Sequence, residues 1–333
     1  MSKKIKVLTI SDHPLSPSGV GTQTSYVCEA LLKSGKFEIL SLGGAIKHND
    51  YAGITVAPWG EDWRIIPVDA YGTQEMLRSI IRNEKPDIVW IMTDPRFWEW
   101  LWVMENEIRA LCPLVYYHVW DNYPYPMFNR NYYLSNDYIV TISKLTDDIV
   151  RNVAPEVNCT YLPHAVNPDH FYPYTKEQRQ EFRKTNLEER DQDKFIVFWN
   201  NRNARRKQSG TLIFWFKEWL DQRNLHDKAQ LIMHTDPGDQ HGQDLVHITD
   251  HLGLTNGQIL FSTTKIPLER MGSFYNLADV TVNIADAEGF GLATIESLSC
   301  GTPIIVTMTG GLQEQVIDGP ETFGIPLFPV SKA

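Results

Sequence analysis

The chain has 333 residues, which exceeds the usual size of a single hydrophobic core and favours two domains. Its hydrophobic content of 42% and charged content of 22% are ordinary for a globular protein. A formal net charge of -10 excludes a general nucleic-acid binder, which would need a basic surface, and does not favour docking on an anionic membrane.

The elements expected in the first half follow from apolar runs that alternate with helix-period segments, a pattern typical of parallel α/β units. We expect strands over residues 5–11, 37–42, 87–92, 114–118, 138–142 and 160–162, with helices such as 20–33 and 73–83 between them. The polar stretch 174–194 has few apolar residues, and it predicts a linker that carries a solvated helix.

The second half repeats the alternation. Strands are expected over residues 195–199, 229–234, 258–261, 280–284 and 303–306, and helices over 210–220, 245–252, 267–276, 291–299 and 312–317. We therefore predict an α/β fold with two doubly wound, Rossmann-like domains, residues 1–173 and 195–333, facing each other across a cleft. Ligands of such sheets bind beyond the carboxyl ends of the strands.

The four cysteines and the hydropathy pattern bear on the cellular compartment. The cysteines are scattered and form no C-x-x-C pair: Cys28, Cys112, Cys159 and Cys300. This spacing fits reduced thiols and gives no metal site. No signal peptide precedes the strand at residue 5, and no apolar run approaches the roughly 18 residues of a membrane span. We expect a cytoplasmic protein without a transmembrane segment.

The most informative segment is 288–296, EGFGLATIE, in which two carboxylates stand eight positions apart. It follows a buried strand and opens a helix, so free backbone N–H groups and the positive end of a helix dipole meet at the glycine turn. A second glycine turn, Gly310-Gly311, follows the next strand. Glu288 and Glu296 are solvated surface residues in the simplest interpretation, but their place beside two such turns indicates a site for a phosphate flanked by hydroxyls.

Four cations follow the strand 195–199: Arg202, Arg205, Arg206 and Lys207. A solvated loop would explain them, but a nucleotide diphosphate explains them better in an acidic protein. Cations placed there would also stabilise the charge that develops on a departing diphosphate. We favour Arg202 and Lys207 for this role and treat Arg205 and Arg206 as surface residues.

Three further features are weaker signals. The S-P-S-G-V-G-T loop at 16–22, with Gly19 and Gly21, resembles a phosphate loop but matches neither standard motif. His118 ends the strand 114–118, where either a satisfied structural histidine or a ligand contact is expected. Aromatic residues crowd 97–133; Trp98 and Trp102 are expected in the core, and 123–133 is a candidate wall for an acceptor.

Several catalytic motifs are absent from the sequence. It contains no G-x-S-x-G elbow, no H-E-x-x-H motif and no Walker lysine. The triplet Asp286-x-Glu288 looks like a metal-binding D-x-D, but Glu288 has a better assignment, so we expect no obligatory metal or cofactor.

These segments, in this order, resemble the GT-B-fold glycosyltransferases, specifically the retaining enzymes of glycosyltransferase family 4. The resemblance is strongest from residue 275 through Glu288, Glu296 and 301–303 to Gly310-Gly311-x-x-Glu314. The segment Leu162-Pro163-His164-Ala165-Val166-Asn167 is similar to the family's P-N/H-G-V-D motif, with Ala165 in place of Gly and Asn167 in place of Asp. Relatives continue with further helices beyond the Gly310-Gly311 segment, so the C-terminal part here is short.

The resemblance implies a role for each matching residue. Glu296 would hold the ribose of a donor nucleotide, Glu288 would contact hydroxyls of the donor sugar, and Arg202 and Lys207 would neutralise the diphosphate. His118 would touch the donor sugar near the reacting centre. The remaining donor contacts would come from the glycine turns: Gly19, Gly21, Gly289, Phe290, Gly291 and Leu292.

The implied reaction transfers a sugar from a nucleoside diphosphate, UDP rather than GDP on family prevalence, to an acceptor hydroxyl of a glycan, lipid or protein with retention of anomeric configuration. The leaving phosphate would take the acceptor's proton, so no glycosidase-like carboxylate pair is needed. Two alternatives stay open: an epimerase acting on a sugar nucleotide, and a protein that binds a sugar nucleotide without turning it over.

Overall fold

The structure, a computed structural model, describes residues 3–329 and divides into two compact units, with the boundary between His164 and Ala165. This boundary lies before the position 173 expected from the sequence. The physical reason is that the segment after it packs on the second unit: Phe171 is buried against Tyr275, and the Asn276 amide bonds the backbone of Tyr172 and Tyr174.

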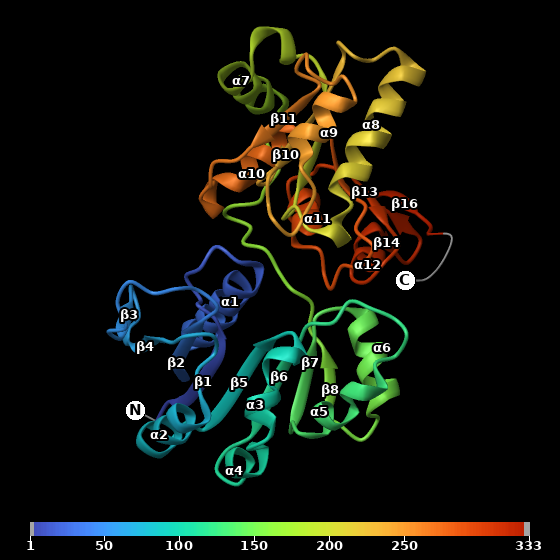
Figure 1. Cartoon of the computed structure of the whole chain (residues 1–333). Helices are drawn as coiled ribbons and strands as arrows, with labels where there is room; N and C mark the ends of the chain where they lie inside the picture. Colours follow the sequence, from blue (N-terminus) through green and yellow to red (C-terminus); the bar gives the residue numbers. More distant parts are fainter. Residues whose placement is uncertain (1–2, 330–333) are drawn as a thin grey trace. The chain divides into compact units, whose positions relative to one another are not determined.

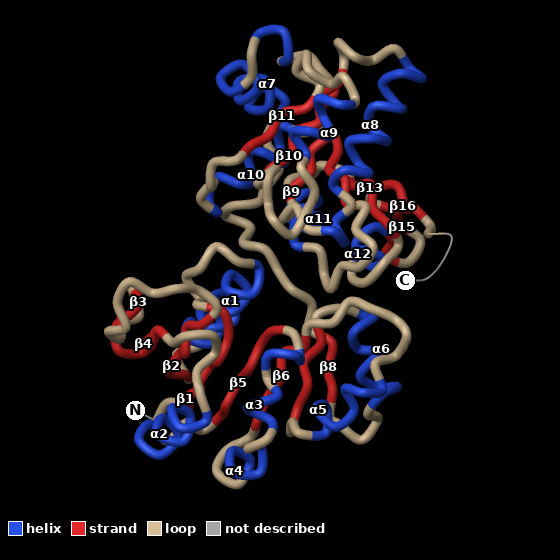
Figure 2. Tube along the Cα trace, viewed as in Figure 1, coloured by secondary structure: helices blue, strands red, loops and turns tan. Residues whose placement is uncertain are grey.

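The first unit contains helices that flank a sheet (Figures 1 and 2). Its strands are β1 (Ile5–Asp12), β2 (Phe37–Gly44), β3 (Ile54–Val56), β4 (Gly60–Pro67), β5 (Ile88–Thr93), β6 (Leu114–His118), β7 (Tyr138–Thr141) and β8 (Cys159–Tyr161). Its helices are α1 (Gly19–Lys33), α2 (Gln74–Glu84), α3 (Glu99–Trp102), α4 (Glu105–Arg109), α5 (Arg130–Leu134) and α6 (Lys144–Val153), with 3-10 turns η1 (Pro95–Phe97) and η2 (Met127–Asn129).

The second unit has the same alternating plan. Its strands are β9 (Phe195–Asn200), β10 (Ala229–His234), β11 (Ile259–Ser262), β12 (Val280–Asn283), β13 (Ile304–Thr307), β14 (Ile317–Asp318), β15 (Glu321–Thr322) and β16 (Gly324–Leu327). Its helices are α7 (Lys176–Asn186), α8 (Ser209–Arg223), α9 (Leu245–His251), α10 (Leu268–Leu277), α11 (Leu292–Ser299) and α12 (Leu312–Val316), with 3-10 turns η3 (Glu189–Asp191) and η4 (Arg205–Lys207).

The strand order confirms the predicted α/β fold with two doubly wound sheets. Within residues 3–164 the order is β3-β4-β2-β1-β5-β6-β7-β8, parallel except for β3, and within residues 165–329 it is β11-β10-β9-β12-β13-β16, all parallel. The chain moves outward from β1 in both directions, and likewise from β9. The order therefore reverses between β1 and β5 and between β9 and β12, the places where such sheets open a crevice for a ligand.

Each unit has its own apolar core. In the first, side chains of β1, β2, β5 and β6 pack with helices α3 and α4, and Trp98 and Trp102 are buried as expected. In the second, the two faces of the sheet pack on α8 and α9 and on α10. Burial of this apolar area stabilises each unit at roughly 25 cal/mol per Å².

Helix α7 lies in the stretch expected as a linker. The helix forms, with the capping box of Thr175 and Gln178, and none of its residues is fully buried. It is nevertheless attached to the second unit, because Arg179 and Arg183 donate hydrogen bonds to the carbonyls at the end of α10 and to Asp279. The arginines thus make this polar segment part of the second unit.

Candidate nucleotide-sugar site

The turn formed by Gly289, Phe290 and Gly291, called here the Gly-Phe-Gly turn, lies between β12 and α11, as the sequence predicts. Strand β12 borders the place where the strand order of the second unit reverses. Gly291 has a φ of 90°, and a side chain there would collide with Leu312 and Thr294. A side chain on Gly310 or Gly311 would collide with the backbone of residues 288–290. Glycine is therefore required at these positions, and the two turns pack directly on each other.

The carbonyl groups of this turn accept hydrogen bonds from Gly311 and Gln315, which lie on the same side of the turn. The Glu288 carbonyl accepts from the Gly311 N–H at 3.1 Å. The Gln315 amide donates to the carbonyls of Phe290 at 2.6 Å and Gly291 at 3.2 Å. In a trans peptide the N–H points opposite to the carbonyl, so the N–H groups of Gly289, Gly291 and Leu292 point away from these partners.

Those three N–H groups donate no hydrogen bond to any residue in the described range 3–329. Gly289 and Gly291 are buried, and unpaired buried N–H groups are unfavourable. They lie at the start of α11, where the helix dipole adds positive potential. An anionic group would satisfy them, which makes the turn a candidate phosphate site.

Lys207 and Glu288 form an ion pair between η4 and the residue before the turn, with side chains only 8% and 12% exposed. Burial raises the pKa of Glu288, but the charges of Lys207 and Arg206 outweigh it and lower that pKa below its ordinary value. Asn283 adds a 3.4 Å hydrogen bond to the same carboxylate. The structure thus brings together two predicted site residues, a cation and an anion, beside the unpaired amides.

Arg206, treated as a surface residue from sequence, ties the two loops together. Its guanidinium donates to the Ala287 carbonyl at 2.5 Å, and its own carbonyl accepts from the Asp286 N–H at 2.8 Å. These bonds fix the position of Glu288 relative to Lys207. Because the two segments are 81 positions apart, no local pattern reveals this contact.

Arg202 lies in the same loop but is 63% exposed. Its guanidinium binds Asp239 at 2.6 and 3.2 Å and His241 at 2.8 Å, both in the segment after β10. Arg202 therefore carries a carboxylate partner that an incoming phosphate would have to replace or share.

Glu296 projects from α11 toward α10, where the fully buried Tyr275 donates a 2.5 Å hydrogen bond to its Oε2. Asn200, at the end of β9, donates to the Tyr275 hydroxyl at 2.8 Å. Burial raises the pKa of Glu296 to about 7, against the opposing effect of the Tyr275 hydrogen bond. Sequence analysis found Glu296 but not the tyrosine and asparagine that hold it.

The glycine loop of the first unit caps α1. Ser18 accepts a hydrogen bond from the Gly21 N–H at 2.9 Å and donates to Asp12 at 2.6 Å. A side chain at Gly21 would collide with Ser16 and with the His13 carbonyl, while Gly19 is exposed. The Gly21 N–H is thus occupied by the cap, and Gly19 remains accessible at the carboxyl end of β1.

His118 ends β6 as expected, but its side chain is fully buried. Its Nδ1 is 2.9 Å from the Tyr116 hydroxyl and its Nε2 is 2.8 Å from the Tyr133 hydroxyl. Burial lowers the pKa of His118 to about 3, so the ring is neutral. In this structure His118 offers no free atom to a donor sugar. Tyr133, expected on an acceptor wall, is likewise a core residue.

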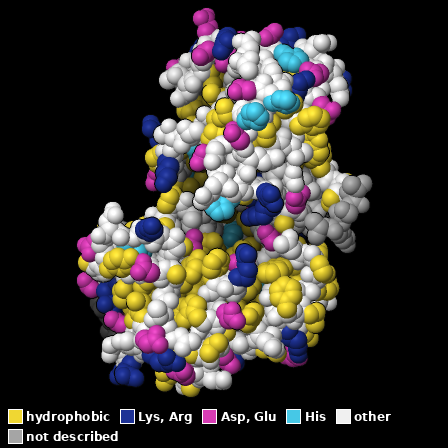
Figure 3. Space-filling model, in the orientation of Figure 1, with side chains coloured by type: hydrophobic (Ala, Val, Ile, Leu, Met, Phe, Trp, Pro, Cys, Tyr) yellow, Lys and Arg dark blue, Asp and Glu magenta, His cyan; other side chains and the backbone are white. Residues whose placement is uncertain are grey.

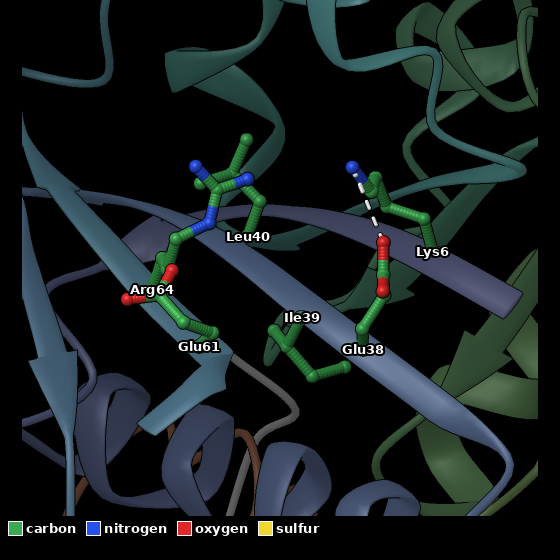
Figure 4. Close-up of a pocket in the computed structure, with 6 residues that line it drawn as sticks. All are labelled: Lys6, Glu38, Ile39, Leu40, Glu61 and Arg64. Atoms are coloured by element: carbon green, nitrogen blue, oxygen red, sulfur yellow. Dashed lines mark ion pairs between the residues drawn. The ribbon is translucent and has the colours of Figure 1, made fainter. Parts of the chain in front are cut away.

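Cavities elsewhere in the first unit do not belong to this site. One of about 220 Å³ lies over β1, β2 and β4, with the six lining residues shown in Figure 4. Its cations are paired: Lys6 with Glu38 at 3.2 Å and Arg64 with Glu84 at 2.7 Å. Another, of about 570 Å³, is lined by residues of α2 and α4.

Residues 3–329 show no sign of a metal site or of a membrane-spanning helix. No group of three or more His, Cys, Asp or Glu side chains there has the arrangement of a metal site. No helix in that range has the length and apolar character of a membrane span. The four cysteines are free thiols. Figure 3 shows acidic and basic side chains interspersed over the face in view.

Comparison with solved structures defines the fold class. The sucrose-phosphate synthase of Thermosynechococcus elongatus superposes with a TM-score of 0.75 and 20% identity, covering 98% of this chain and 87% of that one. The Anabaena protein HepE, solved with UDP and glucose, gives a TM-score of 0.68 at 16% identity, covering 98% and 86%. The chain has the fold of the GT-B glycosyltransferases.

Comparison of sequences finds similarity in the second unit. Residues 178–325 match the family model described as Glycosyl transferases group 1. The D-inositol 3-phosphate glycosyltransferase of Acidothermus cellulolyticus is 43% identical over 54 residues, 16% of this chain and 12% of the relative. The D-inositol 3-phosphate glycosyltransferase of Streptosporangium roseum is 43% identical over 75 residues, which cover 22% of this chain and 17% of the relative. These matches span well under two thirds of the relatives' length.

Proposed function

We propose that this chain transfers a sugar from a nucleoside-diphosphate sugar to an acceptor hydroxyl, with retention of anomeric configuration and without an obligatory metal. The observation that carries the proposal is the set of unpaired N–H groups of Gly289, Gly291 and Leu292 next to the Lys207–Glu288 pair. This combination fits an anion joined to a hydroxyl-rich group. The match of residues 178–325 to the glycosyl transferases group 1 model supports the same conclusion.

Each part of the donor is assigned to residues of suitable charge and hydrogen-bonding capacity. The diphosphate meets the unpaired amides and Lys207, with Arg202 as a more exposed second cation. Glu288 accepts hydrogen bonds from sugar hydroxyls, and Glu296 accepts them from the ribose through the oxygen that Tyr275 leaves free. We assign no donor contact to His118, because both ring nitrogens are engaged.

Lys207 acts most strongly late in the reaction. When the bond from the sugar to the diphosphate breaks, negative charge grows on the leaving oxygen, and a cation held in a buried position stabilises that charge without reorganising. Lys207 is already fixed by Glu288, so it requires little movement. The leaving phosphate takes the proton of the acceptor hydroxyl, and neither glutamate needs to act as a nucleophile.

UDP is the proposed nucleotide. The supporting observation is that HepE, which shares the fold, is described with UDP and with UDP-glucose. A cytoplasmic location is part of the proposal, supported by four thiols that remain unpaired.

The proposal is tested by thermal shift of the full chain with UDP-, GDP-, ADP- and dTDP-sugars, because a ligand that binds only the folded state raises its stability. We expect UDP-sugars to give the largest shift. Lys207→Ala should weaken UDP binding at least tenfold, about 1.4 kcal/mol, whereas Lys217→Ala, which removes a helix-surface ion pair with Asp221, should not. No shift with any donor, or unchanged affinity in Lys207→Ala, would overturn the proposal.

The reaction itself has two further readouts. Treatment with EDTA should leave transfer activity intact, and loss of activity restored by Mn²⁺ would contradict the metal-free part of the proposal. The anomeric configuration of the product, read from NMR coupling constants, should equal that of the donor.

A further inference from the structure

A buried amide lies beneath the Gly-Phe-Gly turn and contacts it through two bonds. Gln315, on α12, is only 6% exposed. Its two N–H bonds are directed at neighbouring carbonyls, Phe290 at 2.6 Å and Gly291 at 3.2 Å. An amide nitrogen has two protons to donate, so both are used on the backbone of the turn.

Thr294, on α11, fixes which way this amide faces. Its hydroxyl lies 2.5 Å from Gln315 Oε1 and 2.7 Å from the Gly291 carbonyl. The hydroxyl has a single proton, and the Gly291 carbonyl already accepts from Gln315, whereas Oε1 needs a donor. The proton therefore goes to Oε1, and the nitrogen of Gln315 stays on the side of the turn.

The turn needs such a restraint because of its glycines. Peptide units next to glycine adopt either orientation at little steric penalty, since glycine accepts both signs of φ. The Gly291 carbonyl also accepts from the Thr294 and Ile295 N–H groups at the start of α11, which hold the peptide between Gly291 and Leu292. If the peptide between Phe290 and Gly291 rotated by half a turn, a carbonyl oxygen would replace the Gly291 N–H at the face opposite Gln315. That oxygen would repel an anion instead of binding it.

We propose that Gln315 and Thr294 are positioning residues, which hold the peptide between Phe290 and Gly291 so that the N–H group of Gly291 faces the diphosphate of the donor. The inference rests on the proposed function. Neither side chain touches the ligand; each acts through the backbone. The second glycine turn, Gly310-Gly311, places Gln315, because α12 begins directly after Gly311 and brings Gln315 into contact with the first turn.

Isosteric substitutions test the inference in the full chain, with UDP as the probe in isothermal titration calorimetry. Gln315→Glu replaces the donating nitrogen by an oxygen that only accepts, and Thr294→Val removes the hydroxyl that orients the amide. We expect each to lower UDP affinity at least tenfold. Thr294→Ser retains the hydroxyl and should bind UDP within threefold of the unmodified chain.

A loss of general stability must be separated from a loss of positioning. Arg183→Ala removes hydrogen bonds between α7 and the end of α10 in the same unit, away from the turn. It should lower the melting temperature of the free chain yet retain UDP affinity, so it is the matched control. If Gln315→Glu does not fold, the Thr294→Val and Thr294→Ser pair still decides the question.

The outcomes distinguish the two proposals. Failure of the unmodified chain to bind UDP, GDP, ADP and dTDP would overturn the proposed function, and the positioning inference with it. Binding by the unmodified chain together with unchanged UDP affinity in Gln315→Glu or Thr294→Val would overturn the positioning inference alone. A crystal structure of Gln315→Glu with the turn unaltered would contradict it as well.

Discussion

His118 shows how a single buried residue can make the stability of a domain depend on pH. Its pKa of about 3 lies below the ordinary value of 6.5, because burial disfavours the charged ring. The unfolded chain therefore binds a proton near pH 6.5 that the folded chain does not bind. Stability from this residue is complete above pH 6.5 and falls as the pH is lowered toward 3.

We predict that His118→Gln, which can still bond the two tyrosine hydroxyls, reduces this acid sensitivity. Urea unfolding at pH 7 and pH 5 should show the unmodified chain losing about 2 kcal/mol more than the variant, since 1.5 pH units at 1.36 kcal/mol each separate pH 5 from 6.5. Affinity for UDP-glucose, which carries the sugar that His118 would contact, should not change. A tenfold loss of affinity would instead support the donor contact that the family resemblance implies.

Glu296 makes donor binding depend on pH. Its pKa of about 7 means that the carboxylate is partly protonated at neutral pH. Ribose hydroxyls donate hydrogen bonds best to the ionised form, so UDP affinity should rise from pH 6 to pH 8. Glu296→Gln should bind more weakly at pH 8 and show a flat profile in calorimetry. Tyr275→Phe removes a bond that lowers this pKa, so its midpoint should move to higher pH; a midpoint that moves down would refute the assignment.

At the level of elements, α7 has no fully buried residue and is held by two arginines together with the partly buried Phe182. Arg183 is 15% exposed and bonds the Leu277 carbonyl at 2.7 Å and Asp279 at 2.8 Å. We predict that Arg183→Ala lowers the free energy of unfolding by about 2 to 3 kcal/mol, because hydrogen bonds between charged groups are lost and Asp279 loses a partner. Arg190→Ala, at an exposed pair with Glu188, should cost less than about 1 kcal/mol. Equal effects in urea denaturation would show that α7 is held in another way.

The elements also show what a sequence can reveal. Strands such as β1 and β10 are predictable, because parallel strands that are buried on both faces form short, nearly continuous apolar runs in the sequence. Strand β4 is not, since Gly60, Glu61 and Asp62 read as a loop although Trp63 and Ile65 beyond them are buried. It pairs with β2 on one side and with β3 on the other.

Some residues of the candidate site could likewise be predicted from the sequence, and others could not. Glu288, Glu296 and the glycines follow from a strand, turn and helix that are contiguous in sequence. The contacts of Gln315, Tyr275 and Arg206 depend on which helices and strands become neighbours, so their local sequence does not reveal these roles. The strand that ends at His118 was predicted, but the burial of its side chain follows from packing against Tyr116 and Tyr133, whose hydroxyl groups bond its ring.

For the whole molecule, the two units have different roles in donor binding. Every charged group and amide proposed for the diphosphate lies after His164. We predict that UDP slows hydrogen–deuterium exchange in the full chain over 200–208, 288–296 and 309–315, because a bound ligand suppresses local opening. Core peptides of β5 and β6 should exchange unchanged and serve as the internal control. Slowing at 16–22 would reveal that the first unit also contacts the nucleotide, while slowing confined to the first unit would contradict the placement of the donor site.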